Sequence, residues 1–135
     1  MTPEQKIMHM VLIKHASFDD VYTVPEDLSA ENIERYYNEA DDADGGYALQ
    51  DARSEIRCSG IETNIRPPSS RHYEAKSVAA QYIDGSWVGW TYWYGGGKHG
   101  EPEAIDWMDE AYDLNCEEKQ VTVTQRTFTQ PPTTA

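Results

Sequence analysis

The stretch that most constrains this fold is a pair of β-forming segments joined by an Asp-Gly dipeptide. The segments RHYEAKSVAAQYI (71–83) and SWVGWTYWYG (86–95) flank Asp84 and Gly85. An Asp-Gly pair between runs of β-branched and aromatic residues is a strong short-range signal for a tight hairpin turn. The sequence therefore predicts a central β-hairpin over about residues 72–94.

The second strand of this hairpin carries aromatic side chains on both faces, because successive residues of a strand point to opposite sides. The two faces are Trp87, Thr91 and Trp93 on one side, and Val88, Trp90, Tyr92 and Tyr94 on the other. An antiparallel sheet with one wet face does not need aromatic residues on both sides. We therefore favour burial on both sides, with an aromatic contact surface as the alternative.

Apolar spacing and capping residues predict elements on the N-terminal side of the hairpin. Residues 7–16 are apolar and β-branched enough for a strand, after a frayed segment at 1–6. Ser29 has the properties of an N-cap, and the residues after it have helical apolar spacing. We therefore predict a strand at 7–16 and a helix at about 30–40.

The remaining segments complete a single domain. Residues 48–60 are ambiguous between helix and strand, residues 102–114 fit a helix, and 118–130 alternate like a final strand. This order of elements predicts an α+β fold with a mainly antiparallel sheet. We expect one domain over residues 1–130 and a flexible tail at 131–135.

Acidic residues strongly outnumber basic ones and are concentrated in two blocks. The chain has 24 Asp and Glu against 11 Lys and Arg, for a net charge of −13. Residues 19–44 contain ten acids and one base, and residues 101–118 contain eight acids and no base. Such a chain repels nucleic acid and attracts basic surfaces, so we expect a basic protein partner and no direct nucleic-acid binding. The alternative is that the acidity only keeps the protein soluble.

The apolar and metal-ligating residues give no sign of a membrane segment or a metal centre. The longest apolar run, Met10–Ile13, is too short for a membrane span or a signal-peptide core. We therefore expect a cytoplasmic protein in which Cys58 and Cys116 are reduced thiols. These cysteines, His72 and His99 lack the spacing of a metal site, and we predict no cofactor.

The acidic residues of the predicted 102–114 helix fall on one side, because a helix brings together residues three or four positions apart. The candidate partner-contacting residues of this stripe are Glu103, Asp106, Asp109, Glu110 and Asp113. The candidates from the other acidic block are Glu31, Glu34, Asp41 and Asp42. A row of carboxylates imitates the charge of a DNA backbone; the alternative is an ordinary solvated helix face.

The GGGKHG segment (95–100) follows the aromatic strand directly. It lacks the spacing of a phosphate-binding Walker loop, and its glycines allow the chain to turn sharply. We expect Trp93, Tyr94, Lys98 and His99 to add an anchor to the partner surface, because aromatic residues dominate binding hot spots. A small-ligand pocket lined by aromatic residues beside this loop is an alternative.

The Glu74-Ala-Lys76 sequence resembles the acid-x-lysine core of PD-(D/E)XK nucleases. In that family the acid helps to bind a divalent metal and the lysine positions or activates water, which implies a metal-dependent nuclease or phosphodiesterase. The second acid that this chemistry needs has three candidates, Asp51, Glu55 and Glu62. We favour the alternative of an ion pair on an exposed strand face, and we expect a non-catalytic protein.

The segment SRHYEAKSVAAQ…DGSWVGWTYWYGGGKHGEPEAIDWMDEAY, about residues 70–112, resembles a pattern in small accessory proteins of bacteriophages and prophages. No activity is assigned to that group, so the resemblance implies a setting and no site residues. It implies a bacterial cytoplasm and a host or defence protein as the partner. We therefore expect an acidic, DNA-mimicking protein that blocks a basic, nucleic-acid-binding protein.

Overall fold

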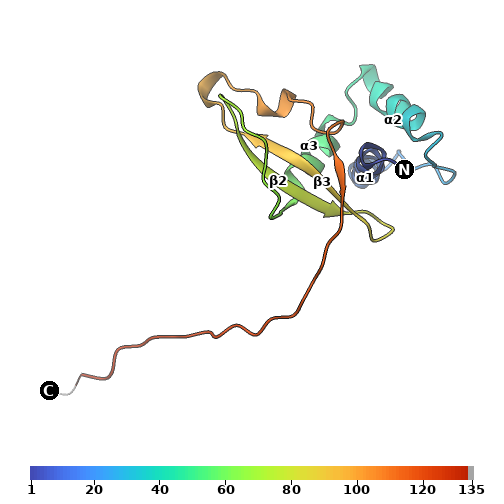
Figure 1. The fold of residues 1–135 in the computed structure, drawn as a ribbon. Coiled ribbons are helices and arrows are strands. Elements are labelled where there is room, and N and C mark those ends of the chain that lie inside the picture. Colours follow the sequence, from blue (N-terminus) through green and yellow to red (C-terminus); the bar gives the residue numbers. More distant parts are fainter. Residues whose placement is uncertain (134–135) are drawn as a thin grey trace.

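The computed structural model describes residues 1–133 and has three helices beside a four-stranded sheet (Figure 1). The helices are α1 (Pro3–Phe18), α2 (Ile33–Asp42) and α3 (Gln50–Ser59). The strands are β1 (Ile61–Glu62), β2 (Glu74–Gln81), β3 (Trp87–Tyr94) and β4 (Tyr112–Leu114). They are antiparallel in the order β1-β2-β3-β4, which confirms the predicted α+β class. The end of the predicted tail, 134–135, lies outside the described residues.

Helix α1 occupies the segment for which the sequence predicted a frayed end at 1–6 and a strand at 7–16, and both predictions are wrong. The helix begins with a capping box. The Gln5 backbone N–H donates to the Thr2 hydroxyl at 3.2 Å, and the Thr2 backbone N–H donates to Gln5 Oε1 at 3.0 Å. This arrangement satisfies N–H groups that the start of a helix leaves without a partner.

The packing of α1 explains why the helix is preferred over a strand. Ile7, Val11 and Leu12 are fully buried; Ile7 and Val11, four positions apart, share one side of the helix, and Leu12 follows Val11 at the edge of that side. The helix packs against α2, α3 and the sheet. The strand preference of β-branched residues is weak, and burial of one helix face overrides it.

Helix α2 begins at Ile33, later than the predicted 30, and the Ser29 side chain does not cap it. Instead, the Ile33 N–H donates to the Ser29 carbonyl at 2.9 Å, and the Ser29 N–H donates to Asn32 Oδ1 at 2.7 Å. A separate turn therefore precedes the helix, and Asn32 is at the N-cap position. The ambiguous segment 48–60 is mainly helical as α3.

The hairpin predicted at 72–94 is confirmed, with β2 and β3 paired along their whole length. The Tyr82 N–H donates to the Ser86 carbonyl at 2.8 Å, and the Gly85 N–H donates to the Tyr82 carbonyl at 2.9 Å. Gly85 has a φ of +91°. The loop is therefore a tight turn followed by a residue in positive φ, which explains the glycine at this position.

The helix predicted at 102–114 is wrong. Only Pro102–Ala104 forms a single 3-10 turn, after which the chain continues irregularly to β4. Trp107 and Met108 are adjacent in the sequence, and both are buried, at 6% and 7% exposure. Adjacent residues of a helix point in directions about 100° apart, so the burial of both side chains in the core favours an irregular backbone over the predicted helix.

The final strand predicted at 118–130 is also wrong. Residues 119–133 are extended and exposed, and they run away from the rest of the molecule (Figure 1). None of them takes part in a hydrogen bond within the described structure. A strand is stable only when a neighbouring strand pairs with it, and this segment has no such neighbour among residues 1–133.

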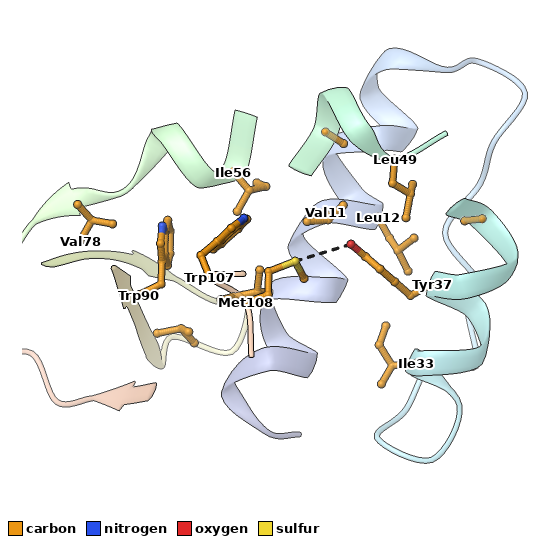
Figure 2. Close-up of a cluster of buried hydrophobic side chains, with 14 residues drawn as sticks. Val11, Leu12, Ile33, Tyr37, Leu49, Ile56, Val78, Trp90, Trp107 and Met108 are labelled. Atoms are coloured by element: carbon orange, nitrogen blue, oxygen red, sulfur yellow. Dashed lines mark hydrogen bonds between the residues drawn. The ribbon is translucent and has the colours of Figure 1, made fainter. Parts of the chain in front are cut away.

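One cluster of buried side chains fills the space between the helices and the inner face of the sheet (Figure 2). Trp90 is fully buried, its ring centroid lies 5.5 Å from that of Trp107, and its Nε1 donates to the Arg57 carbonyl at 3.2 Å. On the helical side, the Tyr37 hydroxyl donates to the Met108 sulfur at 3.7 Å. Trp107 and Met108 therefore join the irregular segment to the core.

The outer face of the sheet is covered in part by the side chains of β4. A Cβ atom on Gly89 would lie 2.6 Å from Tyr112 Cε2 and 2.8 Å from Leu114 Cδ1. Ser77 and Thr91 on this face are buried as well. Every residue of β3 is buried or half-buried, so the aromatic strand serves mainly the interior, as favoured from the sequence.

Candidate functional site

The acidic residues that the sequence assigned to one helical stripe occupy different environments in the structure. Glu103 lies on the edge of a hollow that also contains Arg53 and Arg57. Asp113 forms an ion pair with Lys6 at 3.3 Å. Glu110 is exposed. Because the helix is absent, the predicted stripe is wrong as a single row.

Two members of the predicted stripe do meet acids from other parts of the chain. Partial burial, and then the negative charges of Asp109, Asp106 and Glu34, raise the pKa of Glu4 above its ordinary value. Asp109, Asp106 and Glu34 therefore lie near enough to Glu4 for their charges to act on it. We call Glu4, Glu34, Asp106 and Asp109 the acidic cluster.

The fold assembles the acidic cluster from three segments. Glu4 is in the first turn of α1, and Glu34 is in the first turn of α2. Asp106 and Asp109 are exposed, on either side of the buried Trp107–Met108 pair. Negative side chains are favoured at helix N-termini, and burial of the intervening pair holds the two aspartates at the surface.

No base neutralises this cluster within residues 1–133, since none of its carboxylates forms an ion pair there. The expectation from the sequence was an acidic surface, and three of the four residues were among its candidates. Glu4 is not among the candidates, because the sequence predicts a frayed segment at 1–6. The Thr-Pro-Glu-Gln sequence at residues 2–5 is a helix-start signal that identifies this glutamate.

The other candidates from the first acidic block have separate roles. Asp41 pairs with Arg53 at 3.3 Å and accepts a hydrogen bond from the Leu49 N–H at 3.2 Å, so it is a structural residue. Hydrogen bonds from its own backbone N–H and from the Ser29 side chain lower the pKa of the exposed Glu31. Asp42 is exposed at the end of α2.

The aromatic end of β3 is bound to basic side chains of the same chain. The Tyr92 and Tyr94 rings stack with centroids 5.6 Å apart. The Arg57 guanidinium lies 4.7 Å from the Tyr92 centroid, and Lys76 Nζ lies 5.4 Å from the Tyr94 centroid. Arg57 also donates to the Trp93 carbonyl. Cation–π contacts and this hydrogen bond occupy much of the predicted aromatic anchor.

Lys98 and His99 are exposed in a 3-10 turn beyond the end of β3. The first turn of α1 lies at the other end of the strand, where Lys6 Nζ donates to Ser86 Oγ at 3.0 Å. An eight-residue strand is about 24 Å long. The structure therefore does not bring Lys98 and His99 together with the acidic cluster.

The Glu74 and Lys76 side chains are exposed on β2. Lys76 is paired with Tyr92 across the hairpin, and it forms no ion pair in the described part of the chain. Of the candidate second acids, Asp51 and Glu55 are on α3 and Glu62 is on β1. Nowhere in residues 1–133 do three His, Cys, Asp or Glu side chains gather closely enough to hold a metal ion.

A hollow of about 390 Å³ lies beside α3. Arg53, Ser54 and Arg57 line it from the helix, and Trp107 lines it from the irregular segment. Arg53 is paired with an aspartate. Arg57 is only 8% exposed and has no carboxylate partner among residues 1–133. A buried cation normally has a counter-ion. Glu103 also lines this hollow but does not form an ion pair with Arg57 in the described residues.

Comparison with protein-family models, curated proteins and solved structures finds no match for this chain. In the described residues, no helix has the length and apolar character needed to cross a membrane. Cys58 and Cys116 are exposed free thiols. The case for function therefore depends on the geometry and charge of the sites described above.

Proposed function

We propose that the protein is a non-catalytic binding protein whose acidic cluster occupies a basic surface of another protein. In this proposal the partner uses that surface to bind nucleic acid, and the protein blocks it as a DNA mimic. The observation that supports the proposal is that carboxylates from α2 and from the 106–109 segment act electrostatically on Glu4 of α1, and that none of the four has an ion-pair partner in residues 1–133.

The electrostatics favour recognition of this kind. Like charges held together lower the stability of the fold, and a basic partner removes that repulsion on binding. The net charge of −13 adds a long-range field that accelerates encounter with a positive surface. Binding should therefore be fast at low salt and weaken strongly as salt is added.

The resemblance of residues 70–112 to small phage and prophage proteins supports a bacterial cytoplasmic setting. In such a setting the partner is a host or defence protein that handles nucleic acid. This part of the proposal depends on the resemblance, whereas the acidic cluster depends on the packing of the chain.

The test is capture of proteins from a bacterial lysate by the immobilised full chain, at low and high salt. We expect a DNA- or RNA-binding protein to be captured at low salt and to be released by salt or by added double-stranded DNA. Capture of proteins that DNA does not displace would contradict the proposed mimicry.

Matched variants separate the acidic cluster from overall charge. The cluster variant is Glu34→Gln, Asp106→Asn and Asp109→Asn. The control neutralises three exposed carboxylates elsewhere, Asp20→Asn, Asp51→Asn and Glu55→Gln. We expect capture to be lost only in the cluster variant. Equal capture by both variants would show that the cluster is not the binding surface.

We propose binding of a small anionic ligand as a second candidate function, because Arg57 is buried without a carboxylate partner in the wall of the 390 Å³ hollow. Guanidinium groups bind carboxylate and phosphate groups through paired hydrogen bonds. Trp107 provides an apolar surface for the body of a ligand. This corresponds to the small-ligand alternative from the sequence, at a different position.

Thermal unfolding in inorganic phosphate and in citrate tests this second candidate, with chloride at the same ionic strength as the reference. We expect phosphate or citrate to raise the midpoint. Ser54→Glu adds a negative charge to the hollow and should abolish the shift, whereas Ser69→Glu, in an exposed loop outside it, should not. An unchanged shift in Ser54→Glu would contradict binding at this site.

A further inference from the structure

The segment 119–133 combines strand-forming sequence with the lack of a strand partner in the described part of the chain. It alternates valine and threonine at positions 121–124, and it continues with Thr-Phe-Thr at 127–129. Val121, Val123 and Phe128 are 73%, 77% and 86% exposed. Apolar and β-branched side chains of this kind favour a half-buried sheet over solvent.

The opposite edge of the sheet has matching unpaired features. β1 pairs only with β2, so its other side is open. The Thr63 N–H donates to the Ser77 carbonyl at 2.8 Å, and by the alternation of an antiparallel ladder, Glu62 and Asn64 direct their backbone groups outward. Ile61 and Ile65 are 59% and 43% exposed beside this edge.

We propose that residues 119–130 of one chain add as an edge strand to β1 of a second copy of this chain, and that two copies exchange these segments reciprocally. A strand laid antiparallel along residues 61–65 can place Val121 and Val123 on the same face as the exposed isoleucines, with one valine opposite an isoleucine and the other opposite Thr63. Main-chain hydrogen bonds to the open edge then satisfy backbone groups that the isolated chain leaves to water.

Charge complementarity supports a second copy as the partner. All 24 acidic residues and nine of the 11 basic residues precede residue 119. The body therefore carries a charge of −15, while Lys119 and Arg126 give the tail a charge of +2. The tail of one molecule is attracted to the acidic body of another, whereas two bodies without tails repel each other.

The geometry of the sheet disfavours insertion of a tail into its own β1 edge. The tail leaves from β4, which is the strand farthest from β1 (Figure 1). A strand added beyond β1 would lie four strand spacings from β4, or about 19 Å. The five residue steps from Leu114 to Lys119 span at most about 18 Å, so the chain would have to cross the sheet fully extended for the tail to begin at that position. Exchange with a second copy does not require this extended crossing.

The experiment is the mass of the full chain by light scattering over a concentration series, together with amide hydrogen exchange. We expect a particle of two chains at high protein concentration. We also expect the amides of residues 120–124 to be protected in that particle, because strand pairing slows their exchange. A monomer over the whole series would overturn the proposal, as would a dimer with unprotected tail amides.

Matched variants assign the contact. Val121→Asp with Val123→Asp, and separately Ile61→Asp with Ile65→Asp, should each weaken the dimer roughly 100-fold or more, because charges replace apolar side chains at the contact. Val21→Asp, at a side chain that is 92% exposed, should leave the dimer unchanged. Unchanged circular dichroism shows that each variant folds. A dimer that persists in either double variant would refute strand addition to β1.

Discussion

The two tryptophans Trp90 and Trp93 are three positions apart on β3, and their indole N–H groups have opposite hydrogen-bonding states. Trp90 Nε1 donates to the Arg57 carbonyl at 3.2 Å, near the C-terminus of α3, where carbonyls lack partners within the helix. Trp93 Nε1 is buried and has no hydrogen-bond partner among residues 1–133. Replacing each tryptophan by phenylalanine removes the N–H and tests what each one contributes.

The structure gives different magnitudes for the two changes. Trp90 is fully buried, and removing roughly three ring atoms costs about 2 kcal/mol at ~0.8 kcal/mol per buried carbon. The Arg57 carbonyl also loses its partner, which costs about 1 kcal/mol more. Trp93 is half-buried, and its loss of contact is offset because an unpaired buried donor is removed. We expect Trp90→Phe to lower the free energy of unfolding by about 3 kcal/mol, and Trp93→Phe to change it by less than about 1 kcal/mol.

The measurement is urea-induced unfolding followed by far-ultraviolet circular dichroism, because tryptophan fluorescence itself changes in both variants. All three proteins are compared at one protein concentration, with the slope of the transition checked for equality. If Trp93→Phe proves as destabilising as Trp90→Phe, the hydrogen-bond reasoning is refuted. The burial of the aromatic strand would then account for stability without any contribution from the indole N–H groups.

Three further changes test other parts of the structure. Gly89→Ala should lower the free energy of unfolding by about 1–3 kcal/mol, measured by urea unfolding, because its methyl group would lie 2.6 Å from the Tyr112 ring. Thr2→Ala should cost about 1 kcal/mol in the same measurement by removing the cap of α1, and no loss would mean that the capping box contributes nothing. The pKa of Glu4 is raised in the folded protein. Protonated Glu4 therefore contributes to the free energy of unfolding at low pH, and this contribution is lost as the pH rises through the pKa of the folded state. The free energy of unfolding of Glu4→Gln should therefore exceed that of the wild type by less than about 1 kcal/mol at pH 7. Below about pH 4 the two should be equal. A variant that is less stable than the wild type at pH 7 would contradict the acidic cluster.

The features that were predicted correctly depend on residues close together in the sequence. Asp84 and Gly85 with their flanking β formers specify the hairpin, because the turn requires a residue that tolerates positive φ. The aromatic alternation along β3 favoured burial on both faces; in the structure Trp90 is buried and the other four aromatic residues are half-buried. The cap at Thr2 is equally local, but the prediction there was a frayed segment followed by a strand, because the β-branched residues of 7–16 favour a strand when considered alone.

The sequence alone determined the hairpin, the concentration of acids in two blocks and the strand-forming character of residues 119–130. Tertiary structure alone decided that residues 7–16 are helical and that the segment with the buried Trp107 and Met108 is irregular where a helix was predicted. It also decided that Glu4 lies near acids from two other segments. The physical reason is the range of the interactions. Turn geometry and alternation act over a few residues, whereas burial of a side chain and repulsion between carboxylates depend on neighbours that are distant in the chain.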